Sequence, residues 1–262
     1  MPATNIKRLG QHWLEDHASL QAMIQAATVQ VDDTVLEIGP GLGSLTQLLI
    51  DAGANVVAVE LDTSLATQLR SRLSNPHDQL TVINQDIMHF NLGELKKGYK
   101  VVANIPYYLT SGLIRLLSEA DDPPVKAVLL VQKEVAARVA ARPGQMSILS
   151  VTTQMYFETT LAIVVSAKLF IPPPKVDSQI LILTRYHRPL FGDQDPRQLF
   201  KLVKAGFSER RKKLRSSLSG GLQISNEQAD KLLNRAGISS SLRAQNLSLD
   251  DWLSLLKIWQ QF

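Results

Sequence analysis

Short apolar runs alternate with segments of helical periodicity along the first half of the chain. The apolar runs predict strands over residues 34–38, 55–60, 80–84, 100–105 and 126–132. The segments between them predict helices over residues 45–51, 63–73, 111–119 and 133–141. Alternation at this spacing is typical of a parallel β-sheet with helices on both faces. This part of the chain is therefore predicted to be an α/β domain with a Rossmann-like sheet.

Beyond residue 140 the pattern is first mixed and then purely helical. Residues 161–165 and 179–183 predict two late strands, while residues 147–157 suit either a strand or a helix. Past Tyr186 the apolar positions recur only at helical spacing. Two pairs in this region predict capping boxes at helix starts, Ser225 with Gln228 and Ser248 with Asp251. We therefore predict two domains, an α/β domain over residues 1–184 and a small all-α domain over residues 185–262.

The composition is ordinary for a globular protein and excludes several kinds of site. Apolar residues make up 45% of the 262 residues, which supports a sizeable core. Because the sequence has no cysteine and its five histidines are scattered, we expect no disulfide and no metal site. No apolar run approaches the ~18 residues of a membrane span, and the first residues lack the apolar region of a signal peptide. We expect a cytoplasmic, monomeric protein without a membrane segment.

Positive charge is concentrated in the last third of the chain. Residues 1–184 hold 14 Lys and Arg against 17 Asp and Glu, a net charge of −3, whereas residues 185–262 hold 14 against 7, a net charge of +7. This asymmetry is typical of a protein that binds a polyanion through one domain, although a solvated helix face is the usual meaning of a basic run. We expect seven C-terminal cations to contact RNA phosphates, namely Lys201, Lys204, Arg210, Arg211, Lys212, Lys213 and Arg215.

A glycine-rich turn follows the first predicted strand and indicates a ligand site. Its glycines are Gly39, Gly41 and Gly43, which let the backbone turn tightly and approach a ligand. The turn is not a dinucleotide fingerprint, because Ser44 takes the place of the third glycine, and it lacks the Lys-Ser/Thr ending of a P-loop. An incidental strand–turn–helix is the alternative.

Two carboxylates narrow the choice of ligand. Glu37 lies at the end of the strand before the turn, where it opposes a pyrophosphate and suits a cation. Glu60 ends the next strand, about 20 residues past the glycines, where a ribose diol is usually held. A ligand with a ribose, a positive charge and no phosphate indicates S-adenosylmethionine. The predicted fold is therefore the class I S-adenosylmethionine-dependent methyltransferase sheet, and S-adenosylhomocysteine would be the product.

The turn Asn104-Ile105-Pro106-Tyr107 after the fourth strand resembles the N-P-P-Y type of motif in enzymes that methylate exocyclic amines of bases. The N6 amine of adenine is a poor nucleophile, because its lone pair is delocalised into the ring. The Asn104 amide oxygen and the Ile105 carbonyl would accept its two hydrogens and stabilise the positive charge that develops. Pro106 would fix the turn and Tyr107 would stack on the base. A strand-ending turn with a core tyrosine is the alternative.

Further candidates have both a functional and a structural explanation. Asp86 ends the third strand and would accept a hydrogen bond from the donor's adenine amine, unless it only caps a turn. Phe170 precedes a triple proline and would face Tyr107 across the base, although alone it is more typical of a core residue. Residues 7–14 would either cover the mouth of a ligand site or plug the core with Trp13 and Leu14.

Taken together, these motifs resemble the ribosomal RNA adenine dimethyltransferase family, and specifically its small-subunit (16S-type) branch. The resemblance runs from about Lys7 to about Leu256. It is carried by nine segments in order: KRLGQHWL at 7–14, EIGPGLGSLT at 37–46, VVAVELD at 56–62, NQD at 84–86, NIPYYL at 104–109, VQKEVAAR at 131–138, FIPPPKVDS at 170–178, FSERRKKLRSSL at 207–218 and LRAQNLS at 242–248.

The resemblance implies an enzyme that converts two adjacent adenosines near the 3′ end of small-subunit ribosomal RNA to N6,N6-dimethyladenosine. It implies pre-30S-type particles as partners and a role in small-subunit maturation. The donor would be contacted by His12, Leu14, Gly39, Glu60, Asp86 and Asn104. The target base would be held by Asn104, Ile105, Pro106, Tyr107 and Phe170.

The sequence departs from the family pattern in two places. Trp13 stands where phenylalanine is usual, and Met146-Ser147 stands where Tyr-Gly is common, after a shortened loop at Gly144. Neither position belongs to the donor-contacting set that the resemblance implies, but the second leaves RNA contacts at the substrate rim open. Two other functions remain as alternatives, a large-subunit adenine methyltransferase of the macrolide-resistance type and a non-catalytic RNA-binding assembly or transcription factor.

Overall fold

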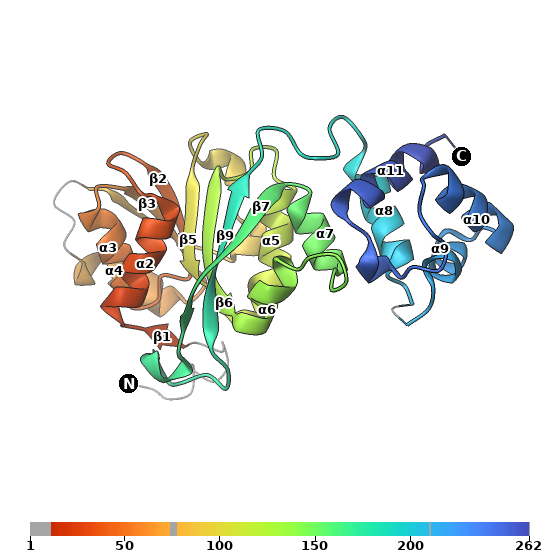
Figure 1. The fold of residues 1–262 in the computed structure, drawn as a ribbon. Coiled ribbons are helices and arrows are strands. Elements are labelled where there is room, and N and C mark those ends of the chain that lie inside the picture. The colour runs from red at the N-terminus through yellow and green to blue at the C-terminus, as the bar shows by residue number, and fades with distance from the viewer. Residues whose placement is uncertain (1–11, 74–77, 210, 262) are drawn as a thin grey trace. The chain divides into compact units, whose positions relative to one another are not determined.

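The computed structural model describes residues 12–73, 78–209 and 211–261, which form two compact units (Figure 1). The first unit consists of Met1–Ala136 and Glu158–Arg185, and the second of Ala137–Phe157 and Tyr186–Phe262. Residues 137–157 thus group with the C-terminal residues. Which unit binds which ligand stays a prediction from sequence.

A seven-stranded sheet forms the centre of the first unit, in the order β4-β3-β2-β5-β6-β9-β7. The five strands expected from the apolar runs are all present and pair in parallel with their neighbours. They are β2 (Thr34–Ile38), β3 (Asn55–Glu60), β4 (Leu80–Asn84), β5 (Lys100–Asn104) and β6 (Lys126–Gln132). The two late strands, β7 (Phe157–Val165) and β9 (Ser178–Arg185), complete the sheet, and β9 runs antiparallel to β6.

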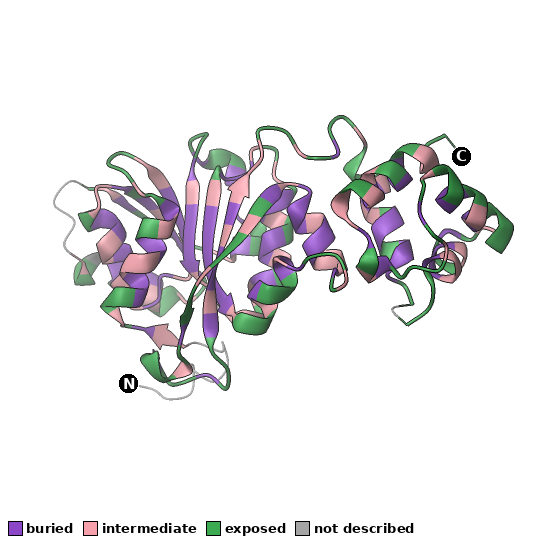
Figure 2. Ribbon diagram, viewed as in Figure 1, coloured by how far each residue is buried: buried purple, intermediate pink, exposed green. Residues whose placement is uncertain are grey.

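Burial of both faces explains why the central strands are continuously apolar. Val35 and Leu36 are neighbours on β2 and face opposite sides of the sheet, yet both are fully buried. Helices flank the sheet and provide this cover (Figures 1 and 2), as a parallel sheet requires. They are α2 (His17–Ala27), α3 (Ser44–Asp51), α4 (Thr63–Arg72), α5 (Thr110–Ser118) and α6 (Lys133–Val139). The prediction of a Rossmann-like α/β sheet is confirmed.

A second, two-stranded sheet joins distant parts of the first unit. Strand β1 (Trp13–Leu14) pairs antiparallel with β8 (Phe170–Ile171), so that Trp13 lies opposite Ile171 and Leu14 opposite Phe170. Four short 3₁₀ helices complete the described part of this unit: η1 (Ile87–His89), η2 (Leu92–Glu94), η3 (Tyr107–Leu109) and η4 (Ala167–Leu169). The β1–β8 pair brings residues 12–14 to the same place as the proline-rich segment.

The second unit is helical. Its elements are α7 (Ile148–Gln154), α8 (Pro196–Gly206), α9 (Leu214–Leu222), α10 (Asn226–Arg235), η5 (Ala244–Asn246) and α11 (Leu249–Trp259). Both expected capping boxes are present, at Ser225 and at Ser248. The ambiguous residues 147–157 are helical over α7, which Ser147 caps, and β7 begins only at Phe157.

Close packing of α8 on α9 depends on a glycine in the core of the second unit. A Cβ atom at Gly221 would lie 2.6 Å from the Cα atom of Ala205, which is closer than atoms can pack. The core around it is dominated by leucine and includes the fully buried Trp252. A small helical core of this kind explains the helix-spaced apolar stripes in the C-terminal sequence.

Candidate active site

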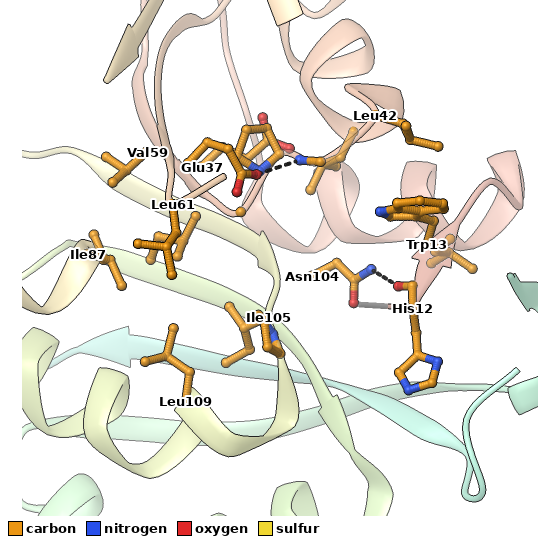
Figure 3. Close-up of a pocket in the computed structure, with 18 of the residues that line it drawn as sticks. His12, Trp13, Glu37, Leu42, Val59, Leu61, Ile87, Asn104, Ile105 and Leu109 are labelled. Atoms are coloured by element: carbon orange, nitrogen blue, oxygen red, sulfur yellow. Dashed lines mark hydrogen bonds between the residues drawn. The ribbon is translucent and has the colours of Figure 1, made fainter. Parts of the chain in front are cut away.

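The glycine-rich turn and the Asn104 turn follow neighbouring strands and open into one cavity of about 240 Å³ (Figure 3). The chain proceeds outward from β2 to β3 and β4, and then returns to place β5 on the other side of β2. Ligands of open α/β sheets bind at such a reversal, beyond the carboxyl ends of the strands. The two turns that the sequence singled out therefore lie at the position where this fold binds ligands.

The glycine-rich turn is held in a conformation that favours glycine. Gly39, Gly41 and Gly43 all have positive φ values, of 66°, 56° and 88°. The N–H of Gly39 donates to the Val59 carbonyl on β3, 2.9 Å away. A Cβ atom at Gly43 would also lie 2.9 Å from the Leu69 side chain. The turn is thus fixed against β3 and α4 and cannot easily accept side chains.

Two buried carboxyl groups stand behind this turn. Glu60 is 4% exposed and accepts the N–H of Gly41 at 3.1 Å and that of Asp62 at 2.9 Å. Burial raises the pKa of Glu60, and these backbone hydrogen bonds oppose the rise. Each carboxylate oxygen has a second lone pair, so Glu60 can still accept hydrogen bonds from a ligand's hydroxyls.

Glu37 is more deeply buried than Glu60. It is 1% exposed, and its Oε2 atom has no hydrogen-bond partner among the described residues. Burial raises the pKa of Glu37 to about 8, Thr46 opposes this rise and the neighbouring Glu60 adds to it. A cation in the cavity would lower the pKa of Glu37 again, because it stabilises the charged carboxylate.

Asp86 follows β4 and lines the same cavity. Its Oδ1 atom accepts the N–H of Met88 at 2.9 Å, so the side chain caps the short helix η1. The capping role that the sequence offered as an alternative is therefore present. It does not exclude the ligand role, because the carboxylate retains further acceptor positions.

The Asn104 turn presents acceptors toward the cavity. The Asn104 amide nitrogen donates to the His12 carbonyl at 3.4 Å, so that among the described residues the amide oxygen is left as an available acceptor (Figure 3). Ile105 is buried, and Pro106 precedes the 3₁₀ helix η3. The turn thus has the oxygen acceptors that the chemistry at an adenine amine requires.

Tyr107 is held on both its ring face and its hydroxyl. Its hydroxyl is 3.0 Å from the Ser178 hydroxyl, and the His12 imidazole stacks on its ring with centroids 5.9 Å apart. Burial raises the pKa of the Tyr107 hydroxyl, so it stays protonated. Ser178, the last residue of the proline-rich motif, had no role predicted from the sequence, and its contact with Tyr107 provides one.

Phe170 lines the cavity but is mostly a core residue. It is 2% exposed and packs with Leu14 and Leu20 in the core of the first unit. The structure therefore brings Phe170 and Tyr107 to one cavity, with the His12 ring against Tyr107. Leu14, 4% exposed, is both a core residue and part of the cavity lining. Residues 7–11 of the same segment lie outside the described residues, and a role of residues 7–14 in covering the ligand site stays a prediction.

The polar groups of the cavity suit a cationic nucleoside without a phosphate. Glu37, Glu60 and Asp86 contribute carboxylates, and the described lining residues include no lysine or arginine. A phosphate would be repelled here, whereas a sulfonium and an ammonium group would be attracted. These residues therefore fit S-adenosylmethionine. Within the described residues no cluster of metal-ligating side chains is found, and no helix there is long and apolar enough to cross a membrane.

The basic residues of the second unit differ in their availability. Of the seven cations expected to contact RNA, three are engaged within the unit: Lys201 lies over the Trp259 ring at 5.9 Å, Lys212 pairs with Glu209 and Arg215 pairs with Asp230 at 3.3 Å. The others in the described part are exposed and make no ion pair there, namely Lys204, Arg211 and Lys213. Arg210 lies outside the described residues.

The family model described as ribosomal RNA adenine dimethylase matches residues 3–261. The chain belongs to the ribosomal RNA adenine dimethylase family. It is an S-adenosylmethionine-dependent methyltransferase, which agrees with the fold and the cavity. The resemblance stated from the sequence motifs is therefore confirmed.

Individual relatives support the same assignment. The chain is 38% identical to "Ribosomal RNA small subunit methyltransferase A" of Dehalococcoides mccartyi over 97% of this chain and 88% of that one. It is 39% identical to the Synechocystis protein of the same name, over 98% and 96%. Among solved structures, a Plasmodium falciparum dimethyladenosine transferase superimposes with a TM-score of 0.82 at 26% identity, covering 95% and 98% of the two chains. The 23S rRNA methyltransferase ErmE gives 0.77 at 29%, covering 95% and 100%.

Proposed function

We propose that this family member dimethylates N6 of two adjacent adenosines near the 3′ end of small-subunit ribosomal RNA, during maturation of that subunit in the cytoplasm. One observation carries the proposal: the glycine-rich turn and the Asn104 turn open into a single cavity at the sheet's switch point. The names of relatives that are 36–39% identical support the small-subunit branch. Pre-30S-type particles are the partners we propose, with the protein acting as a monomer.

The donor would be held by the strand ends and the glycine-rich turn. Glu60 would bind the ribose diol and Asp86 the adenine amine, while Glu37 faces the positive charge. The turn would contact the donor through Gly39, Gly41 and Gly43, and β1 would do so through His12 and Leu14. When bound, S-adenosylmethionine supplies an activated methyl group. S-adenosylhomocysteine is the product that must leave the same site.

The Asn104 turn would hold the target adenine. The Asn104 amide oxygen and the Ile105 carbonyl accept the two N6 hydrogens and so stabilise the charge that develops on nitrogen. Pro106 fixes the turn, and Tyr107 stacks on the base, with Phe170 as the buried wall of the slot. The base must leave its stack in the RNA to enter. Because His12 now stacks on Tyr107, its ring must share this slot or move aside.

The second unit would position the RNA. Its exposed cations Lys204, Arg211 and Lys213 are the first candidates for phosphate contacts. Lys212 and Arg215 can join them at small cost, because exposed ion pairs contribute little to stability. Lys201 would give up only its contact with the Trp259 ring. Arg210 belongs to the same basic run. Contacts of this kind fix position without reading sequence.

The main alternative is a large-subunit adenine methyltransferase. The structural similarity to ErmE supports a shared fold and shared turns, but the identity of 29% is lower than the 36–39% with relatives of the small-subunit name. A non-catalytic RNA-binding factor is disfavoured by the acceptors at Asn104 and the carboxylates in the cavity.

The test is methyl transfer to immature small subunits by the wild type and by Asn104→Ala. The variant loses the acceptor for N6, so transfer should fall by at least about 100-fold, while donor affinity stays within about tenfold because several other contacts remain. Asn55→Ala, at the amino end of strand β3 and so away from the carboxyl ends that line the cavity, is the matched control and should transfer normally. Near-normal transfer by Asn104→Ala would refute the role given to this turn.

A further inference from the structure

Trp13 presents a buried hydrogen-bond donor that no described residue accepts. Its Nε1 atom is shielded from solvent and has no hydrogen-bond partner. Buried polar groups in native proteins are nearly always paired, so an orphan of this kind needs an explanation.

The indole lies on the wall of the donor cavity, against the glycine-rich turn. A Cβ atom at Gly41 would be 3.4 Å from both Cδ1 and Nε1 of Trp13, so the N–H edge of the indole faces this glycine. Strand pairing of Trp13 with Ile171 fixes the backbone from which the ring projects. Figure 3 shows the ring nitrogen directed toward the cavity rather than away from it.

Comparison with Trp252 shows what is particular to Trp13. Both indole nitrogens lack a hydrogen-bond partner among the described residues, and the two side chains differ in where they lie. The side chain of Trp252 is fully buried in the core of the second unit. No ligand can reach a donor in such a core. Trp13, by contrast, lines the cavity, and its N–H edge lies against Gly41 in the wall of that cavity.

The proposed ligand carries one anionic group, for which the described cavity lining offers no cationic side chain. The carboxylates of Glu37, Glu60 and Asp86 suit the ammonium, hydroxyl and amine groups of S-adenosylmethionine. The carboxylate of its methionine part needs a hydrogen-bond donor, and no lysine or arginine is among the described lining residues. A neutral N–H serves this purpose without attracting the protein's own carboxylates into an ion pair.

We propose that the indole N–H of Trp13 donates a hydrogen bond to the α-carboxylate of the methyl donor. Trp13 is then a donor-binding residue that distinguishes ligands with the amino-acid carboxylate from those without it. The inference rests on the proposed function, since it takes S-adenosylmethionine as the ligand of this cavity.

Calorimetric binding to the full chain tests this proposal. Trp13→Phe keeps an aromatic ring over Gly41 and removes the N–H. It should weaken S-adenosylhomocysteine and S-adenosylmethionine by about 10- to 100-fold, the range for a hydrogen bond to a charged group. Decarboxylated S-adenosylmethionine and methylthioadenosine lack the carboxylate, so their dissociation constants should change less than about twofold. Trp259→Phe, in the second unit, is the control and should leave all four unchanged.

A second variant separates the N–H from the shape of the ring. Replacing the Trp13 indole by benzothiophene substitutes sulfur for the N–H and keeps the bicyclic ring, and it should give the same selective loss. An equal loss for all four ligands, or no loss for any, would overturn the proposal. If the wild type bound none of them, the proposed function itself would fail, and the two failures are therefore distinct.

Discussion

The buried carboxyl group of Glu37 should make the stability of the protein depend on pH. In the folded state its pKa is about 8, against 4.5 for an unperturbed glutamate, because burial disfavours the charged form. Below pH 4.5 the group is protonated in both states, and its contribution to stability is then fully present. Between pH 4.5 and 8 the unfolded chain loses the proton that the folded protein keeps, so the free energy of unfolding falls as pH rises.

The size of the effect follows from the two pKa values. They differ by about 3.5, and at about 1.4 kcal/mol per pH unit the full effect is about 5 kcal/mol. Glu37→Gln keeps the shape of the side chain and removes the titration. The difference in unfolding free energy, variant minus wild type, should therefore grow by roughly 4 kcal/mol between pH 5 and pH 8.

Urea unfolding at a series of pH values measures this difference directly. Glu15→Gln, which removes an exposed carboxyl group by the same substitution, is the matched control. If Glu37→Gln ran parallel to the wild type from pH 5 to pH 8, Glu37 would be ionised in the folded protein. The view that the cavity holds a neutral carboxyl until a cation arrives would then be refuted.

Two further predictions concern the second unit. Gly221→Ala should lower the unfolding free energy by about 1–3 kcal/mol, because the new methyl group overlaps Ala205. Its control is Gly220→Ala, whose methyl group points into open space and should raise the unfolding free energy by about 0.5–1 kcal/mol. Equal effects of the two substitutions in thermal unfolding would contradict the packing of α8 on α9. Lys213→Ala should make the negative slope of log affinity for RNA against log salt concentration shallower by about 1, whereas Lys96→Ala in the first unit should leave that slope unchanged.

The strands and the two ligand turns could be predicted from the sequence because their signals are local. Each central strand is a continuous apolar run, since a parallel sheet buries both of its faces. The expected strand over 34–38 has the same bounds as β2, and that over 100–105 ends one residue earlier, at Asn104. The glycine-rich turn is likewise visible in the sequence, because its backbone conformation favours glycine at three alternate positions.

Long-range pairing was not predictable in the same way. The pairing of Trp13 and Leu14 with Ile171 and Phe170 joins distant segments of two residues each, which are too short to show a periodicity. The antiparallel direction of β9 is also absent from any local pattern. For the same reason the sequence left the role of Trp13 open, because its missing hydrogen-bond partner is visible only once β1 lies beside the cavity.

The most direct test of the account is to map the methyl groups that the purified protein adds to ribosomal RNA. Wild-type protein and labelled S-adenosylmethionine are incubated with separate small and large subunits that lack the modification, and the RNA fragments are analysed by mass spectrometry. The account predicts two adjacent N6,N6-dimethyladenosines near the 3′ end of the small-subunit RNA and none in the large subunit. Labelling of the large-subunit RNA, or binding of the donor without transfer to either subunit, would contradict it.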